Sequence, residues 1–288
     1  MVFSRRSRMR AGFMAKRQTD EVLSRLRREP RHNLSLLDIV DGGSADLPDP
    51  NPPPQIVVAR SGDRIAGVAS LRPSIVLEAE MGADALEASM PLLSCLEMGL
   101  IKSQADAVAS VWDSLRARGR RSILDRCEEC LVLETEKATP AVAGSPAVER
   151  LRRARTSDLD ALVFAARSSL LEENRPDPFH GDPEGFRHWV KGRIGRARLL
   201  EVDDKPVFVG YVDVRRPEGW LIQGVYTWPD HRRRGFARAG MAGLVGEAVQ
   251  AGAEHVQLAV VEGNLPAMGL YEGLGFKAFS QLRTILFH

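Results

Sequence analysis

Three arginines and a glycine stand between a strand and a helix, and this arrangement suits a phosphate. In TWPDHRRRGFARAGMAGL (227–244), a strand rich in β-branched and aromatic residues ends at Trp228-Pro229, and an amphipathic helix begins at Gly235. A helix N-terminus offers unpaired N–H groups and the positive end of its dipole. Gly235 lets the backbone approach closely, and Ala237 avoids crowding. The segment lacks the signatures of a Walker loop and of a dinucleotide fold. By themselves, the arginines could also form a basic solvated turn.

Asn264 and Tyr271 form a second candidate for chemistry. Asn264 is a preferred N-cap residue for a helix predicted over 265–273. Tyr271 follows seven residues later and lies nearly on the same helix face. A phenol with a pKa near 10 stays protonated at neutral pH and can donate its proton to an anionic leaving group. The alternative is an aromatic ring that packs on the sheet with its hydroxyl at the surface.

Carboxylates and imidazoles could serve as acid–base groups. Glu172 and Glu173 follow a predicted helix, and three roles stay open: general base, binding of a cationic acceptor, or solvation of the helix end. We interpret His180 and His188 as loop and helix-surface residues, and His231 as a capping or packing residue. No metal cluster is expected. Cys127 and Cys130 form a C-x-x-C pair without a second ligand pair, so we expect ordinary half-buried thiols.

Length and composition limit the class of protein. The 288 residues suffice for two domains, and hydrophobic and charged contents of 44% and 27% are ordinary for a globular protein. The net charge of +2 indicates no particular partner, and we expect no nucleic-acid or membrane binding. The basic residues 1–17 lack an apolar core, so we expect either a disordered tail or an initiation site misplaced upstream of Met14, with a transit peptide as the alternative. We expect a cytoplasmic protein.

Periodicity and turn residues predict two mixed α/β domains. In the first, over 18–136, we expect a helix at 18–40, a loop at 46–54, strands at 56–60, 65–71 and 74–80, helices at 84–98 and 104–118, and a strand at 129–135. Residues 137–147 read as a linker. In the second, over 148–288, we expect strands at 148–154, 197–203, 206–214, 219–227, 255–261, 276–279 and 282–287. The predicted helices span 158–171, 184–195, 236–251 and 265–273, with Ser157 and Asp160 as a capping box for the first. The fold class is α+β, with helices on both sides of a sheet.

These motifs together resemble the GNAT superfamily of N-acetyltransferases. Residues Arg232 to Ala237, with the lead-in from Val225 to Pro229, are similar to the family signature R-x-x-G-x-G/A. A second family element, Asn-x-x-Ala-x-x-x-Tyr-x-x-x-Gly-Phe, is matched at Asn264, Ala267, Tyr271, Gly275 and Phe276. The resemblance covers 148–288 and implies a mostly antiparallel, splayed sheet. LLEENRPDP (170–178) and the ending TILF are similar to actinobacterial-type members with an extra N-terminal domain. In tandem members that half is a decayed second copy, which fits 18–136; this half lacks the signature and is expected not to bind coenzyme A.

The resemblance implies an acetyl group moved from acetyl-CoA to a primary amine in a ternary complex, without a metal. Tyr271 would be the general acid, with Glu172 or Glu173 at the acceptor site. Histone-acetylating members carry a glutamate at the position of Leu221, so a histone-type mechanism is not indicated. The acceptor would be a small amine or a protein amine, and the protein a monomer or homodimer. The alternative is a non-catalytic acyl-CoA sensor. The expected cofactor-binding residues are Val225, Tyr226, Thr227, Arg232, Arg233, Arg234, Gly235, Phe236, Ala237, Arg238, Asn264 and Ala267.

Overall fold

The chain divides into two compact units that do not follow a single cut in the sequence. The computed structural model describes residues 9–42, 55–138 and 151–288. Within these residues, unit 1 holds the N-terminal part up to Cys127 together with 281–288, and unit 2 holds 128–280. The predicted loop at 46–54 and nearly all of the predicted linker at 137–147 lie outside the described residues. The last residues, 281–288, group with unit 1 although they follow unit 2 in the sequence.

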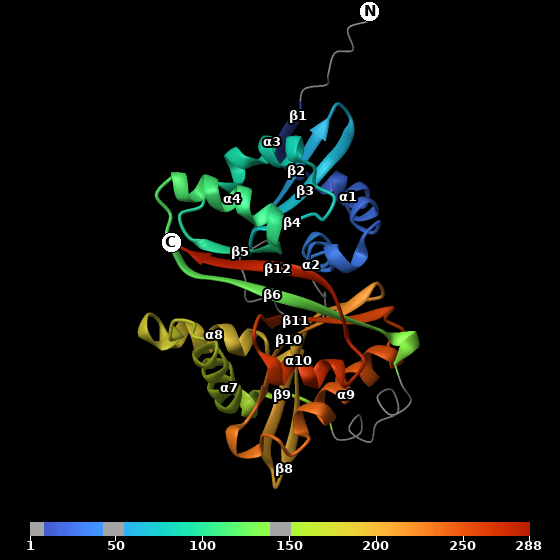
Figure 1. The fold of residues 1–288 in the computed structure, drawn as a ribbon, viewed down its shortest axis with the longest axis vertical. Coiled ribbons are helices and arrows are strands. Elements are labelled where there is room, and N and C mark those ends of the chain that lie inside the picture. Colours follow the sequence, from blue (N-terminus) through green and yellow to red (C-terminus); the bar gives the residue numbers. More distant parts are fainter. Residues whose placement is uncertain (1–8, 43–54, 139–150) are drawn as a thin grey trace, which may run out of the picture. The chain divides into compact units, whose positions relative to one another are not determined.

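Unit 1 contains a small antiparallel sheet between helices (Figure 1). Its strand order is β1-β2-β3-β4. The elements are β1 (Met9–Phe13), α1 (Thr19–Leu26), α2 (Pro30–Val40), β2 (Gln55–Ser61), β3 (Arg64–Arg72), β4 (Val76–Leu77), α3 (Ala83–Leu93), β5 (Gly99–Gln104), α4 (Ala105–Ala117) and the start of β6 (Ser122–Glu134).

Three predictions for this part of the chain are corrected. Residues 9–13 are not disordered but form β1, because they pair in antiparallel register with β2. The single helix expected at 18–40 is two helices, since Pro30 cannot continue a helix and begins α2 instead. The helix expected at 84–98 ends at Leu93, and the missed strand β5 follows it.

Unit 2 carries the second set of elements. They are the end of β6, then β7 (Arg152–Arg153), α7 (Leu159–Glu172), α8 (Pro183–Gly192), β8 (Ala197–Val202), β9 (Lys205–Arg216), β10 (Gly219–Thr227), α9 (Phe236–Gln250), β11 (His255–Val261), α10 (Leu265–Glu272) and the start of β12 (Lys277–Phe287). The two strands expected at the C-terminus are one continuous strand, β12. The expected capping box at Ser157 and Asp160 is absent; instead the Asp158 carboxylate accepts from the Arg155 N–H at 2.7 Å.

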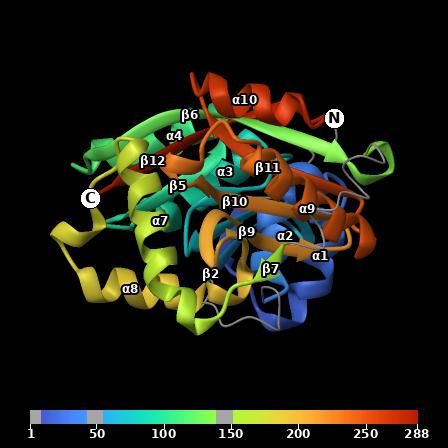
Figure 2. The same ribbon diagram turned by 90° about the horizontal axis from the view of Figure 1, so that it is seen from below.

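The helices of unit 2 cover opposite faces of its sheet, as Figure 2 shows. Leu200 and Phe208 point into a core with α9, whereas their neighbours Leu199 and Val209 point into a core with α7 and α8. Successive side chains of a strand point to opposite faces, so this alternation produces a sheet buried on both sides. The mixed α/β class predicted from the sequence is confirmed.

The two halves of the chain repeat one order of elements. From β1 to β6 and from β7 to β12, strands and helices follow each other as β-α-α-β-β-β-α-β-α-β. The two halves also share a parallel contact at the same place. Ile75, just before β4, forms a parallel bridge with Ile101 of β5, and Trp220 of β10 pairs in parallel with Val256 of β11. The last strand of each half is exchanged. Residues 128–134 of β6 pair with β11 in unit 2, and 282–287 of β12 pair with β5 in unit 1.

Candidate active site

The central feature of unit 2 is a strand that leaves its neighbour. β10 pairs in parallel with β11 at Trp220 and Leu221, and the described residues show no pairing between these strands beyond that point. β10 continues to Thr227, paired only with β9 on its other edge. The backbone groups of the second half of β10 therefore face a gap in the sheet. Backbone donors and acceptors in such a gap can bind an extended, amide-containing ligand.

An irregularity in β10 changes the direction in which these backbone groups point. The register against β9 shifts between Gln223 and Tyr226, and Gly224 between them has a φ of +57°. A Cβ at Gly224 would lie 2.9 Å from the Tyr211 ring, so only glycine fits this bulge. Beyond it, the Trp228 N–H donates to the Val207 carbonyl on β9 at 3.2 Å. Because backbone groups alternate along a strand, those of Val225 and Thr227 face the opposite edge, toward the gap.

The gap leads to the N-terminus of α9. A short 3-10 turn, Pro229–His231, connects β10 to Arg232, and α9 begins after Gly235. Gly235 has a φ of +84°, and a Cβ placed on it would meet nothing within 4 Å. The glycine is thus required by its left-handed backbone, and open space lies beside it. The first turn of α9 contains no acidic residue, so nothing on the helix opposes an anion there.

The arginines of the signature have different partners. Arg234 lies over the Phe236 ring at 5.4 Å and contacts the His231 imidazole at 3.3 Å. Arg238 donates to the Gly273 carbonyl at 2.9 Å. Arg233 is exposed and has a φ of +57°, which holds the loop in a second left-handed position. The guanidinium groups of Arg233, Arg234 and Arg238 therefore place positive charge at the exposed start of α9.

Arg232 is held away from this group by two other contacts. Its Nη2 donates to both carboxylate oxygens of Glu172, at 2.7 and 2.9 Å, and its Nε donates to the Thr227 carbonyl at 3.0 Å. Its pKa is raised, chiefly by the hydrogen bond to Glu172. The structure thus joins the first arginine of the signature to a predicted acceptor-site carboxylate that lies 60 positions earlier in the sequence.

Asn264 and Tyr271 occupy the positions expected on α10. The Asn264 side chain is the N-cap of this helix and accepts from the Ala267 N–H at 3.2 Å. Tyr271 is 6% exposed and packs edge-on against Phe276 in the main core of unit 2. Burial raises the pKa of its hydroxyl. The phenol therefore stays protonated well beyond neutral pH, as an acid for a thiolate must.

Around Glu172 the structure assembles aromatic side chains whose meeting at this carboxylate the sequence did not predict. The Tyr226 hydroxyl lies 3.4 Å from a Glu172 oxygen, and its pKa is raised, mainly by burial. Trp228 packs edge-on against Tyr226 and is stacked with Phe164 of α7, at centroid distances of 5.5 and 6.4 Å. Phe164 and Glu172 are eight positions apart on one helix, so they lie near one face. This spacing was the only sequence pattern that could have linked Phe164 to Glu172. Glu173, at the end of α7, is partly buried.

The remaining candidates do not form a site in the part of the chain that the structure describes. His180 lies in a short turn and His188 on α8, both exposed. Cys127 and Cys130 lie on β6 and are not joined in a disulfide. The described residues hold no group of three or more metal-ligating side chains. None of the helices found there combines the length and apolar character needed to cross a bilayer.

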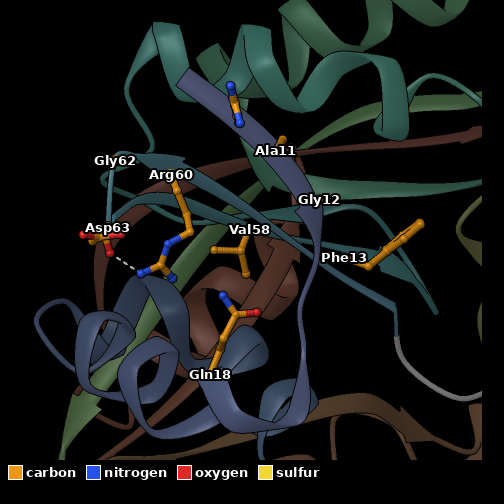
Figure 3. Close-up of a pocket in the computed structure, with 9 residues that line it drawn as sticks. Ala11, Gly12, Phe13, Gln18, Val58, Arg60, Gly62 and Asp63 are labelled. Atoms are coloured by element: carbon orange, nitrogen blue, oxygen red, sulfur yellow. Dashed lines mark hydrogen bonds between the residues drawn. The ribbon is translucent and has the colours of Figure 1, made fainter. Parts of the chain in front are cut away.

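A pocket of about 500 Å³ lies in unit 1 and contains none of the predicted site residues. It is lined by β1, β2 and the turn between β2 and β3. Figure 3 shows Arg60 turned toward Asp63, whereas Phe13 points away from both. Arg60 is also bonded to both carboxylate oxygens of Glu21, at 3.1 Å each. The side chains that line this pocket therefore do not converge on a common point.

Known proteins similar to this chain agree with the geometry. The sequence model of the acetyltransferase (GNAT) family matches residues 161–276. A comparison with curated proteins finds no match. Among solved structures, a Drosophila protein aligns with a TM-score of 0.69 at 14% identity, over 96% of this chain and 98% of its own. A tandem GNAT protein from the clavulanic acid biosynthesis pathway aligns with a TM-score of 0.54 at 15% identity, over 96% and 98%. A GCN5-related N-acetyltransferase from Sphaerobacter thermophilus aligns with a TM-score of 0.53 at 16% identity, over 97% and 95%.

These similarities settle the class of protein. The matched family segment runs from within α7 to just beyond α10, and the structural neighbours share the fold over nearly the whole chain. Residues 161–276 form a GNAT acetyltransferase domain, as the sequence motifs predicted, and the activity of this family is acyl-CoA-dependent acetyl transfer.

Proposed function

We propose that the protein is an N-acetyltransferase that moves an acetyl group from acetyl-CoA to a primary amine within a ternary complex. The observation that carries this proposal is the unpaired edge of β10, which leads directly into the glycine-initiated N-terminus of α9. An extended arm with a phosphate at one end is complementary to such a path. Acetyl-CoA has this chemistry, with its pantetheine arm and its pyrophosphate.

The backbone supplies most of the binding groups. Val225 and Thr227 would pair with the pantetheine arm, because their backbone groups face the gap between β10 and β11. The amides from Arg233 to Arg238 would bind the pyrophosphate at the start of α9. Asn264 would contact pantetheine from the N-cap of α10. A main-chain N–H beside the gap would face the thioester oxygen, and one such donor typically lowers the barrier by about 3–4 kcal/mol.

Tyr271 would complete the transfer as general acid. The neutral amine attacks the thioester carbon, a C–N bond forms, and the C–S bond breaks with its electron pair on sulfur. The Tyr271 proton then moves to that sulfur, and the phenolate regains a proton from solvent. Burial keeps the phenol protonated in the resting protein, which supports this role.

Glu172 is better suited to binding than to proton abstraction. Both of its oxygens already accept from Arg232, so a proton on this carboxylate would compete with the ion pair. We therefore assign Glu172 to the acceptor site. We assign the proton lost from the amine to water. Glu173 is the other carboxylate at the end of α7.

The experiment that tests the proposal measures acetyl-CoA binding and turnover on the full-length protein. Isothermal titration should show acetyl-CoA and CoA binding far more tightly than ATP or NADH. A thiol reagent should then detect CoA release when pooled amines are added. Tight binding without CoA release for any amine pool would instead favour the acyl-CoA sensor. An absence of acetyl-CoA binding would rule out both.

A further inference from the structure

The acceptor side of the site has an ionic end and an aromatic end along one face of α7. Phe164, Ser168 and Glu172 are spaced by four residues, so they form one row on the helix, about 12 Å long. Each contacts a residue at or near the end of β10. Phe164 stacks on Trp228, Ser168 hydrogen-bonds Tyr226, and Glu172 contacts both Tyr226 and Arg232. The row therefore lies beside the strand that is proposed to hold the thioester.

The ionic end has two opposite charges that remain open to solvent. The side chains of Arg232 and Glu172 are 40% and 47% exposed. A guanidinium has more N–H donors than the contacts with Glu172 and Thr227 use. The remaining donors can bind a carboxylate in addition to Glu172. Since Arg232 also holds the Thr227 carbonyl, a carboxylate on this guanidinium would be held close to the proposed acyl group.

The aromatic end supplies exposed apolar surface next to this pair. Phe164 is 50% exposed although it is stacked on Trp228, and Leu171 on the same helix is 44% exposed. Large apolar side chains this exposed can bind the apolar part of a ligand. No other described residue of unit 2 with a large apolar side chain is this exposed, except Leu265 on α10.

We propose that the acceptor is an amino-acid-like amine, one that carries a carboxylate near the amino group and an apolar body. This inference rests on the proposed function and specifies its substrate class. The carboxylate binds Arg232, the ammonium is first attracted to Glu172, and the apolar body lies against Phe164 and Leu171. A polyamine fits less well, because Arg232 repels its charge and neutralises the one carboxylate in this pair.

The experiment compares acceptors that differ in one group. L-Phenylalanine, its amide and 2-phenylethylamine share the ring and the amine, but only the first has a carboxylate. CoA release should show kcat/KM at least about tenfold higher for L-phenylalanine than for either analogue. Glycine should fall below L-phenylalanine because it lacks the ring, and spermidine should be the poorest acceptor. Titration of L-phenylalanine and 2-phenylethylamine into the CoA-saturated protein gives the same comparison without turnover.

Variants assign the preference to Arg232. Arg232→Met should reduce the ratio between L-phenylalanine and 2-phenylethylamine to about one, while Glu172→Gln should keep the preference for the carboxylate. Phe164→Ala should raise KM for L-phenylalanine and leave that for glycine unchanged. The matched control is Arg187→Met, which breaks another exposed arginine–carboxylate pair of unit 2, with Asp160, and should leave all ratios unchanged.

The outcomes separate the two proposals. Equal or better turnover and binding of 2-phenylethylamine overturn the inference and leave the acetyltransferase intact. Selective binding of L-phenylalanine with no CoA release overturns the proposed reaction and keeps the acceptor site. Loss of the ratio in Arg187→Met as well as in Arg232→Met also overturns the assignment, because the effect would then not be local to the pair.

Discussion

The loop before α9 and its counterpart before α3 occupy the same place in the repeated order of elements, yet they have opposite charge. Residues 228–235 carry Arg232, Arg233 and Arg234 ahead of α9, whereas the shorter segment 78–82 carries Glu78 and Glu80 ahead of α3. The first turn of α3 also contains Asp84. Glu78 is buried and pairs with Arg25 at 2.6 Å, so the negative charge at the start of α3 comes from the exposed Glu80 and Asp84. This helix end therefore repels a phosphate that the start of α9 would attract.

The gap in the sheet is closed in the first half. The Ser103 hydroxyl of β5 accepts from the Leu77 N–H at 3.1 Å and donates to the Leu77 carbonyl at 3.2 Å. A side chain thereby satisfies both backbone groups of the last residue of β4. The corresponding strand β11, HVQLAVV, has no serine or threonine, and its gap with β10 stays open.

The helices that follow β11 and β5 also differ, because only the one in the second half carries the polar groups of the candidate site. α10 begins with the capping side chain of Asn264 and places Tyr271 seven residues later. α4 begins after Gln104, which makes no capping hydrogen bond, and has Val111 seven residues later. The first half thus keeps the framework and lacks the chemical groups. The same order of elements can therefore hold a candidate binding site in one half and only packed side chains in the other.

The largest expected effect is on acetyl-CoA binding. Gly235→Glu places a bulky anion where the pyrophosphate would lie and should weaken acetyl-CoA binding by more than about 100-fold, as measured by isothermal titration. The positive φ of Gly235 adds local strain, so Gly235→Asn, which tolerates that backbone, serves as a milder second variant. The matched control is Gly82→Glu before α3, where φ is −68° and a Cβ meets nothing. Wild-type affinity in a folded Gly235→Glu protein would refute the phosphate assignment.

The next effect is on the chemical step. Tyr271→Phe removes a hydroxyl and keeps the ring, so kcat should fall by about 100-fold while the affinity for acetyl-CoA hardly changes. Because burial raises the pKa of Tyr271 above its ordinary value of 10.0, the protonated, active form persists to higher pH. The rate should therefore not decline near pH 10 through this group. An unchanged turnover number would leave Tyr271 as a packing residue.

The smallest effect concerns stability in the half without a site. Ser103→Ala leaves two buried backbone groups of Leu77 without their partner and should cost about 1–3 kcal/mol in the free energy of unfolding. Thermal melting of the full chain measures this. The loss should not create a second acetyl-CoA site, because the exposed Glu80 and Asp84 remain at the start of α3. A titration with two bound acetyl-CoA molecules per chain would contradict the comparison.

Full-length protein is the appropriate material for these tests. β6 and β12 each begin in one unit and end in the other, so a cut between the halves removes a strand from both sheets. A fragment that failed to bind acetyl-CoA would then be uninformative.

The sequence alone determined the local features of the candidate site. Gly235, Asn264 and Tyr271 lie where the motifs placed them, because capping, helix start and left-handed backbone depend on a few neighbouring residues. Most elements were predicted for the same reason, since their hydrophobic periods are local. The errors fell where a distant partner decides: β1 forms because β2 is there to pair with it, and β5 because it pairs with β12.

Only the tertiary structure decided what the charged residues contact. Arg232 was expected among the phosphate-binding residues, and its guanidinium instead holds Glu172 and the Thr227 carbonyl. No pattern within one element records such a pair, because its members come from α7 and from the loop after β10. The closure of the first gap by Ser103 and the exchange of the last strands were likewise decided only by the tertiary structure. Each depends on hydrogen bonds between residues far apart in the chain, which local propensity does not determine.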